Sequence, residues 1–262
     1  MDYRQICEEV CRIAKEAGEF IAEQRKDFSR DKIEHKGAHD MVSYVDKEAE
    51  KITVIGLKAL LPEAGFITEE GTVENSSDNK YTWIIDPLDG TTNFIHGLPP
   101  YCVSIALAED DKIAVGVVYE ITMRECFYAW KDSPAYLNGE EIRASEIKTL
   151  DESLIAVGLA HASQDKINNL LKEMDYFLRN TNGIRRVGSA AADLAYVAAG
   201  RFDAFYQCNL SPWDVAGGAF ICERAGAKVT DFSGGDDYIF GRQIVASNGY
   251  IHDDLSDKII VG

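Results

Sequence analysis

The hydrophobic period of the chain changes twice, and this constrains its fold more than any other feature of the sequence. Apolar residues first recur every three or four positions, which predicts amphipathic helices over residues 3–27 and 43–61, the second with Ser43 as its N-cap. Short runs rich in Ile, Val, Tyr and Trp then predict strands. These runs lie at residues 65–68, 81–86, 101–108, 112–119 and 125–130. Asp110-Asp111 and Asn138-Gly139 predict hairpin turns, so we expect two helices followed by a mostly antiparallel sheet.

From Leu154 onward, strand-like and helical segments alternate. The predicted order is strand 154–159, helix 165–179, strand 184–187, helix 189–199, strand 202–207, helix 214–225, strands 227–232 and 243–247, and a last helix near 253–260. Such alternation is typical of α/β layers, so we expect an α+β N-terminal half and an α/β C-terminal half. We place the boundary near residue 145, which divides the 262 residues into domains 1–145 and 146–262.

The net charge excludes several classes of function. The chain carries 27 Lys+Arg against 44 Asp+Glu, a formal charge of -17, so we expect no nucleic-acid partner and no anionic membrane surface. The N-terminus is charged from its second residue, unlike a signal peptide, and the apolar stretch 98–108 is too short to span a bilayer. The six cysteines form no CxxC pair. These features predict a cytoplasmic protein with reduced thiols.

The strongest chemical signal is the segment 83–93, which reads WIIDPLDGTTN. Its apolar strand is predicted to end at Asp86, because Pro87 cannot donate to a sheet ladder and should turn the chain. Asp89 then returns a second carboxylate to the same side, and the amides from Gly90 onward open a short helix. Carboxylates for a hard cation would thus lie beside amides for a phosphate. Taken alone, Pro-x-Asp-Gly is more often a plain surface turn.

Two further acidic motifs favour a cation site over a plain turn. Glu69-Glu70 ends the strand at 65–68, and the segment 211–218, SPWDVAGG, opens a helix with Asp214. Singly, the first motif is typical of a solvated loop and the second of a helix cap. Together with Asp86 and Asp89 they form an all-oxygen donor set, which is the kind that Mg²⁺ prefers beside a phosphate.

The segments DPLDGTTN at 86–93 and WDVAG at 213–217 resemble the inositol monophosphatase family, and the resemblance runs from about Ile6 to the C-terminus. This family belongs to the lithium-sensitive, magnesium-dependent phosphatases. The resemblance implies a layered αβαβα sandwich, a homodimer and two or three Mg²⁺ ions. The implied activity is that of a phosphoric monoester hydrolase acting on a small polyol phosphate, expected to be inositol monophosphate, by in-line attack of a metal-activated water.

The resemblance also implies a role for each site residue. The first ion would be held by Glu69, Asp86 and the carbonyl of Leu88, and the second by Asp86, Asp89 and Asp214, while Glu69 would face a third. Asp46 would pair with Thr91 to orient and deprotonate the water, with Glu69 also counted among the catalytic residues. The residues expected to contact the substrate are Gly90, Thr91, Gly188, Ser189, Ala190, Gln207 and Asp214, the first two through amides that receive the phosphate.

Three further positions could affect substrate choice or catalysis, and the sequence leaves their roles open. A glutamate is common in the family where this chain has Gln207, which keeps a hydroxyl-binding group but loses the charge. Arg186 would favour a more anionic substrate, or lie at the surface or in an interface. Lys36, in the family's mobile first loop, would be either a catalytic-loop lysine or a solvated one.

Three alternative functions are left open. A 3′(2′),5′-bisphosphate nucleotidase is the first, although such enzymes tend to have Lys-Glu where this chain has Thr92-Asn93. A fructose-1,6-bisphosphatase is the second. The third is a regulatory or binding protein that keeps the fold without turnover, since some bacterial relatives associate with the transcription machinery. Loss of a metal carboxylate or of the Thr/Asp pair would favour it, and the sequence contains all of them.

Overall fold

The computed structural model describes residues 1–29, 33–37, 40–76, 79–158 and 164–260. Its helices are α1 (Tyr3–Lys26), α2 (Tyr44–Leu60), α3 (Thr91–His96), α4 (Gln164–Asn180), α5 (Ala190–Ala198), α6 (Pro212–Arg224) and α7 (His252–Ser256). The strands that precede residue 145 are β1 (Ile33–Gly37), β2 (Asp40–Ser43), β3 (Gly65–Thr68), β4 (Tyr81–Asp89), β5 (Cys102–Glu109), β6 (Lys112–Glu120), β7 (Glu125–Trp130), β8 (Ala135–Leu137) and β9 (Glu140–Ile142). Those that follow it are β10 (Leu154–Val157), β11 (Gly183–Arg185), β12 (Ala204–Cys208), β13 (Lys228–Thr230) and β14 (Gln243–Ser247).

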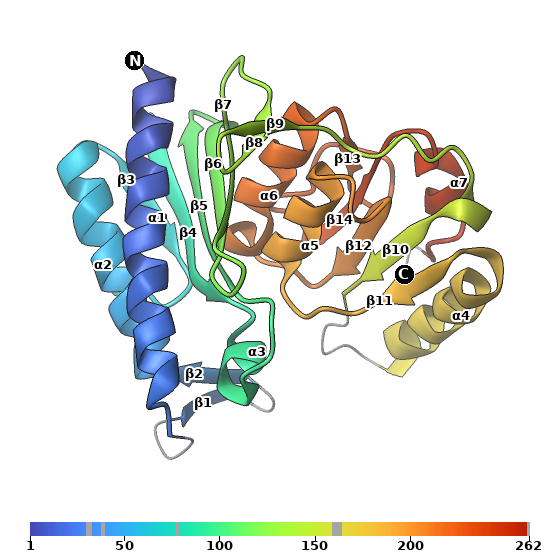
Figure 1. Ribbon diagram of the computed structural model, residues 1–262, viewed down its shortest axis with the longest axis horizontal. Coiled ribbons are helices and arrows are strands. Elements are labelled where there is room, and N and C mark those ends of the chain that lie inside the picture. Colours follow the sequence, from blue (N-terminus) through green and yellow to red (C-terminus); the bar gives the residue numbers. More distant parts are fainter. Residues whose placement is uncertain (30–32, 38–39, 77–78, 159–163, 261–262) are drawn as a thin grey trace.

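These elements stack as helices, sheet, helices, sheet and helices (Figure 1). α1 and α2 cover the outer face of the seven-stranded sheet β3-β4-β5-β6-β7-β8-β9. α5 and α6 lie between the two sheets, and α4 and α7 cover the outer face of the five-stranded sheet β11-β10-β12-β14-β13. The predicted αβαβα sandwich is confirmed. Phe127 of the first half packs in one buried cluster with Phe205 and Phe220 of the second, and the domain boundary near residue 145 stays a prediction.

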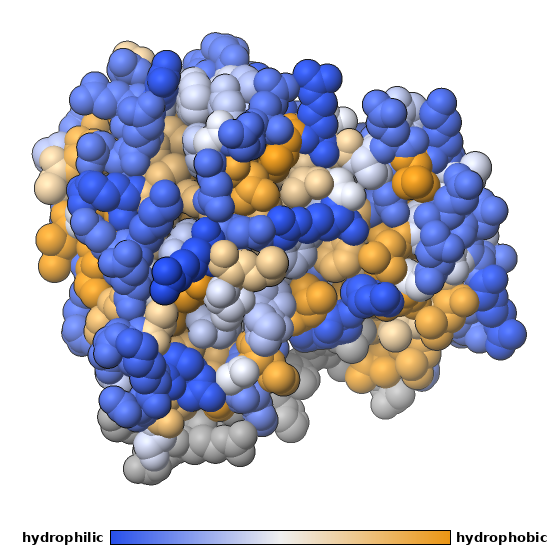
Figure 2. Space-filling model, viewed as in Figure 1, coloured by the Kyte–Doolittle hydropathy of each residue, from blue (hydrophilic) through white to orange (hydrophobic). Residues whose placement is uncertain are grey.

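The outer helices form where the apolar period predicts them. α1 turns Val10, Ala14, Ala17 and Ile21 inward onto the sheet, while hydrophilic side chains cover most of its outer surface (Figure 2). β1 and β2 pair as a separate antiparallel ribbon, in a stretch that the resemblance implies is a loop. Among the described residues, no helix has both the length and the apolarity needed to cross a bilayer.

The seven-stranded sheet is antiparallel except for its first pair, β3 and β4, as the sequence predicts. The turn between β5 and β6 contains Asp110 at a φ of 52°, and the turn between β8 and β9 contains Asn138 and Gly139 at 50° and 97°. Two consecutive positive φ values are what a type I′ hairpin requires, so the turn predicted from Asn-Gly is confirmed.

The five-stranded sheet is mixed. β10 pairs in parallel with β11 and β12, whereas β14 pairs antiparallel with β12 and β13. The strand predicted at 184–187 is Gly183–Arg185, so Arg186 and Val187 lie in the connection to α5. The last helix is also shorter than predicted and ends at Ser256. The α/β layering of this half follows the prediction, and the differences are confined to the ends of its elements.

Glycines allow α6 to pack closely on the seven-stranded sheet. A Cβ built on Gly116 of β6 would lie 2.7 Å from the carbonyl oxygen of Gly217, and one on Gly217 would lie 3.1 Å from Ser104 Oγ. Ser104 Oγ also donates to the carbonyl oxygen of Trp213 at 3.3 Å. The beginning of α6 is therefore held against β5 and β6, and β5 lies beside β4, which carries the acidic motif of residues 86–89.

Candidate active site

A bulge in β4 brings Asp86 and Asp89 to the same face of the sheet. Asp86 pairs with Ser104 and Asp89 pairs with Cys102, so β4 has one residue more than β5 between these two pairs. Residues three apart in a regular strand point to opposite faces, and the extra residue restores the same face. The prediction that Pro87 ends the strand is wrong. β4 continues to Asp89, with Pro87 inside the bulge, where no N–H is needed for the ladder.

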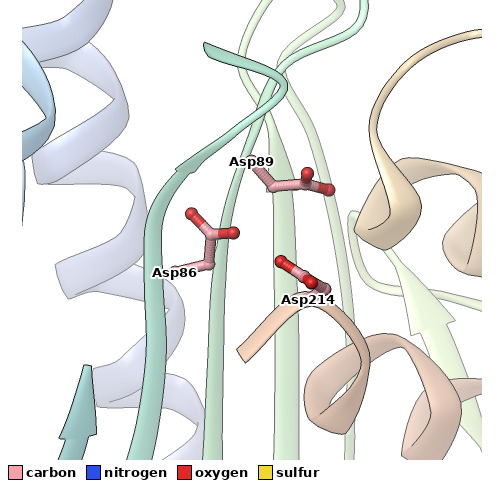
Figure 3. A group of neighbouring side chains, drawn as sticks. All are labelled: Asp86, Asp89 and Asp214. Atoms are coloured by element: carbon pink, nitrogen blue, oxygen red, sulfur yellow. The ribbon is translucent and has the colours of Figure 1, made fainter. Parts of the chain in front are cut away.

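The third carboxylate comes from the first turn of α6. Ser211 is the N-cap and Pro212 the first helical residue, so the helix begins two residues earlier than predicted and Asp214 is not its N-cap. Asp214 instead completes a capping box, because its Oδ2 accepts from Ser211 N at 2.7 Å. Carboxylate oxygens of Asp86, Asp89 and Asp214 lie within 4.8 Å of one another, and the three side chains point toward a common space (Figure 3).

Burial raises the pKa of all three carboxyl groups. The pKa of Asp86 is held well above its usual range by burial and then by the charges of Glu69, Asp89 and Asp214. Burial raises the pKa of Asp89 to about 6, although its Oδ2 accepts from Ser189 Oγ at 2.6 Å and from Ala191 N at 2.7 Å. Burial and the charge of Asp89 raise the pKa of Asp214 to about 7. A cation placed between these groups would remove their repulsion.

Glu69 adjoins this carboxylate cluster from the end of β3. Its negative charge contributes to the raised pKa of Asp86. The loop that follows is held by Glu50 of α2, which is fully buried. Glu50 accepts from Glu70 N at 2.7 Å and from Thr72 N and Thr72 Oγ1, each at 2.7 Å. Glu69, Asp86, Asp89 and Asp214 therefore lie close together, although they come from the end of β3, from β4 and from α6.

Thr91 and Asp46 form a hydrogen-bonded pair beside the cluster. Thr91 Oγ1 lies 3.0 Å from Asp46 Oδ1 and 3.0 Å from the carbonyl oxygen of Leu88, and it donates its single proton to one of them at a time. Asp46 Oδ2 accepts from Ser43 N at 2.8 Å and from Ser43 Oγ at 2.7 Å. Burial raises the pKa of Asp46, and these hydrogen bonds oppose the shift. Gly90, with a φ of 94°, precedes Thr91 as the N-cap of α3, at the helix start that the sequence predicts.

A small pocket of about 110 Å³ adjoins Asp89 and Asp214. Its other lining residues are Gly158, Arg186, Gly188, Ser189, Ala190, Asp193, Gln207 and Leu210. The residues predicted to contact the substrate divide here into two groups. Those of the second half of the chain line this pocket, whereas Gly90 and Thr91 lie outside its lining, at the start of α3. The structure brings the predicted residues together, and their individual roles stay predictions.

Three residues that the sequence analysis did not assign help to build the site. Asn93 Nδ2 donates to the carbonyl oxygens of Val187 at 2.7 Å and of Pro100 at 2.8 Å, which ties α3 to the segment before the pocket. Glu50 positions the loop after Glu69, and Asp193 lines the pocket. Asn93 belongs to the motif DPLDGTTN, and Asp193 is the one charged residue of the segment AAADLAYVA. The side chain of Lys36 lies outside the described residues.

Comparisons with known proteins agree with this fold. The family model described as the inositol monophosphatase family matches residues 2–260. The chain is 40% identical over 237 residues to Nus factor SuhB of Vibrio cholerae, covering 90% of this chain and 89% of that protein. It is 38% identical over 239 residues to inositol-1-monophosphatase of Mesorhizobium japonicum, covering 91% and 90%.

Among solved structures, extragenic suppressor protein SuhB of Bartonella henselae superposes with a TM-score of 0.91 at 36% identity, covering 98% of this chain and 99% of the other. The match of the family model over nearly the whole chain confirms the predicted enzyme class, a phosphoric monoester hydrolase. The chain belongs to the inositol monophosphatase family.

Proposed function

We propose that this protein hydrolyses an inositol monophosphate, or a closely similar small polyol phosphate, with the help of Mg²⁺. The observation that carries the proposal is the meeting of the carboxylate cluster, the Thr91–Asp46 pair and the small polar pocket. The name of the Mesorhizobium japonicum relative supports the substrate class. The family match supports the reaction.

The carboxylate cluster suits Mg²⁺ by its chemistry. Its donors are hard oxygens, and the raised pKa values of Asp86 and Asp214 reflect burial and then the negative charge of neighbouring carboxyl groups, which a divalent cation would offset. Bound Mg²⁺ would neutralise the phosphoryl oxygens and lower the pKa of a nearby water. Following the resemblance, two or three ions would be held by Glu69, Asp86, the carbonyl of Leu88, Asp89 and Asp214.

Thr91 and Asp46 would move the proton of the attacking water. Thr91 Oγ1 would accept this proton and pass its own to Asp46 Oδ1, 3.0 Å away. Ser43 binds the other carboxylate oxygen of Asp46 and so keeps Oδ1 turned toward Thr91. Because burial raises the pKa of Asp46, its carboxylate is a better proton acceptor than an exposed aspartate. The amides of Gly90 and Thr91 would receive the phosphate.

The polyol would enter the pocket beside Asp89 and Asp214. Polar side chains and backbone line most of it, including Arg186, Ser189 and Gln207. Hydroxyl groups both donate and accept hydrogen bonds, so they match such a wall better than an apolar group would. The polar lining and the volume of about 110 Å³ suit part of a small polyol.

The regulatory alternative has one supporting observation, the name Nus factor SuhB of the Vibrio cholerae relative. Against it, the described site retains every acidic residue and the Thr91–Asp46 pair that catalysis would use. We also propose, from the resemblance, that the protein is a homodimer. A cytoplasmic location is supported by six cysteines that are all free thiols, five of them buried.

A side-by-side assay tests the proposed function. Inositol 1-phosphate, fructose 1,6-bisphosphate and adenosine 3′,5′-bisphosphate are each supplied with Mg²⁺, and kcat/KM is measured by phosphate release. We expect the highest kcat/KM for inositol 1-phosphate and no turnover after chelation. A higher kcat/KM for fructose 1,6-bisphosphate would favour the fructose-1,6-bisphosphatase alternative, and a higher value for adenosine 3′,5′-bisphosphate would favour the nucleotidase alternative. Absence of turnover on all three substrates would favour the regulatory alternative.

Lithium sensitivity gives an independent test of the proposed activity. We expect LiCl to inhibit turnover at concentrations where NaCl has no effect. Equal inhibition by the two salts would reflect ionic strength alone and would count against the proposal.

A further inference from the structure

We propose that Asp193 is a specificity-determining residue of this phosphatase, and that its carboxyl group binds a hydroxyl of the polyol in the small pocket. The inference rests on the proposed function and deepens it, because it concerns the part of the substrate that does not react. Asp193 lies on α5, four residues after the N-cap Ser189. It is the one charged residue of a helix that otherwise reads AAA-LAYVA.

The first observation is a buried carboxylate oxygen without a partner. Asp193 is 1% exposed, and its Oδ1 has no hydrogen-bond partner among the described residues. Nearby polar groups are already engaged, since Ser189 Oγ and Ala191 N both donate to Asp89. A buried carboxylate oxygen that lacks a donor is costly, so a donor is expected to come from outside the chain.

The second observation is the position of Asp193 on the pocket wall. It lines the same space as Asp89 and Asp214, together with Arg186 and Gln207. The pocket has a volume of about 110 Å³. A ligand hydroxyl that enters beside Asp89 and Asp214 would therefore lie next to Asp193 in the same lining.

The third observation concerns the two polar side chains that share this wall. Gln207 packs across Gly158, where an added Cβ would lie 1.5 Å from Gln207 Oε1. Arg186 packs against Gly188, where an added Cβ would lie 2.4 Å from Arg186 Nη1. Both glycines leave room for the side chains. The wall thus offers a guanidinium donor, an amide that both donates and accepts, and the acceptor oxygen of Asp193.

These groups together match a polyol. Adjacent hydroxyls of a polyol can each donate one hydrogen bond and accept others, and so can satisfy Asp193, Gln207 and Arg186 together. The family resemblance implies a glutamate where this chain has Gln207. Asp193 supplies a carboxyl group to the same pocket from α5, whereas Gln207 lies on β12. The carboxyl group of Asp193 would therefore replace the glutamate as the acceptor of a hydrogen bond from a polyol hydroxyl.

The test compares two substrates in Asp193→Ala and Asp193→Asn. Inositol 1-phosphate carries hydroxyls next to its phosphate, whereas 4-nitrophenyl phosphate carries none. We expect Asp193→Ala to raise KM for inositol 1-phosphate about 10- to 100-fold with kcat within about 3-fold, and to leave kcat/KM for 4-nitrophenyl phosphate within about 2-fold. Asp193→Asn keeps an acceptor oxygen, so its KM should lie between those of wild type and Asp193→Ala.

The opposite outcomes are distinguishable. An equal loss of kcat/KM on both substrates, or a weaker Mg²⁺ dependence, would mean that Asp193 supports the fold or the metal and would overturn the proposal. Unchanged KM for inositol 1-phosphate in both variants would overturn it as well. If wild type itself fails to prefer inositol 1-phosphate, the proposed substrate is at fault. Circular dichroism of each variant separates a folding defect from a binding defect.

Discussion

Two kinds of buried or half-buried acid occur in this protein, and they differ in which groups face their carboxylate oxygens. Glu50 and Glu120 are both fully buried, yet protein donors surround them. Glu120 accepts from Met123 N at 2.6 Å, from Thr122 N at 3.2 Å and from Thr122 Oγ1. Asp86, Asp89 and Asp214 face one another instead, and their pKa values are raised.

The comparison teaches how to separate structural acids from functional ones. An acid whose oxygens are bound by amides and hydroxyls holds a loop, as Glu50 does for residues 70–72. Asp89 and Asp214 also accept hydrogen bonds from the protein, but their neighbours include other acids, whose negative charge a cation would offset. Asp46 is intermediate, because one of its oxygens is fixed by Ser43 and the other faces Thr91.

The largest expected effect is on activity in Asp214→Asn. The amide keeps an oxygen for Ser211 N, so α6 should still form, but the cluster loses one of its charges. We expect kcat/KM with Mg²⁺ to fall about 1000-fold, with an unchanged circular dichroism spectrum. Near-normal turnover would remove Asp214 from the proposed metal site.

A smaller loss is expected in Thr91→Ala, which interrupts the path from the attacking water to Asp46. We expect kcat to fall about 100-fold while the Mg²⁺ concentration at half-maximal activity changes less than about 3-fold. Steady-state kinetics at varied Mg²⁺ concentration measure both. An unchanged kcat would show that Asp46 acts without Thr91, or that neither moves the proton.

The third expectation concerns stability and pH without divalent ions. The pKa of Asp89 is about 6 and that of Asp214 about 7 in the folded chain, against 3.8 for an ordinary aspartate. The folded state therefore binds more protons than the unfolded state between about pH 4 and pH 7, so the free energy of unfolding should fall as pH rises through this range. Urea unfolding in the presence of a chelator measures it.

Two controls sharpen this pH test. Added Mg²⁺ should restore stability at pH 7 to 8, because bound cations replace the protons. Asp214→Asn should raise the metal-free stability at pH 7.5 and reduce the dependence on pH. A wild-type stability that rises steadily from pH 4 to pH 7 in chelator would show that the cluster is not the dominant titrating group.

The smallest expected effect on activity is that of Glu50→Gln, although its effect on stability is substantial. Weaker acceptors for Glu70 N and Thr72 N should lower the free energy of unfolding by about 2 kcal/mol. Activity should fall only a few-fold, through the loop that carries Glu69. Glu120→Gln is the matched control, since it should lose similar stability with kcat/KM within about 2-fold. Equal activity losses in both variants would show that Glu50 has no specific effect on the loop that carries Glu69.

Much of this protein follows from local sequence. The helical period predicts α1 and α2, the Asn-Gly turn predicts the hairpin of β8 and β9, and the order of the later elements predicts α/β layers. These features depend on residues a few positions apart, where side-chain spacing and backbone preference dominate. The acidic motifs were also visible, because each lies at the end of an element.

Contacts between distant segments could be decided only by the tertiary structure. Pro87 suggested that the strand ends, but pairing with β5 places it in a bulge that turns Asp86 and Asp89 to one face. Asp193 reads as an ordinary helical acid until the packing of α5 and β12 encloses it beside Gln207. The sequence by itself determined which acids are available and in what order. Packing determined which of them face other acids and which face protein donors alone, because burial and hydrogen bonding depend on neighbours far away in the chain.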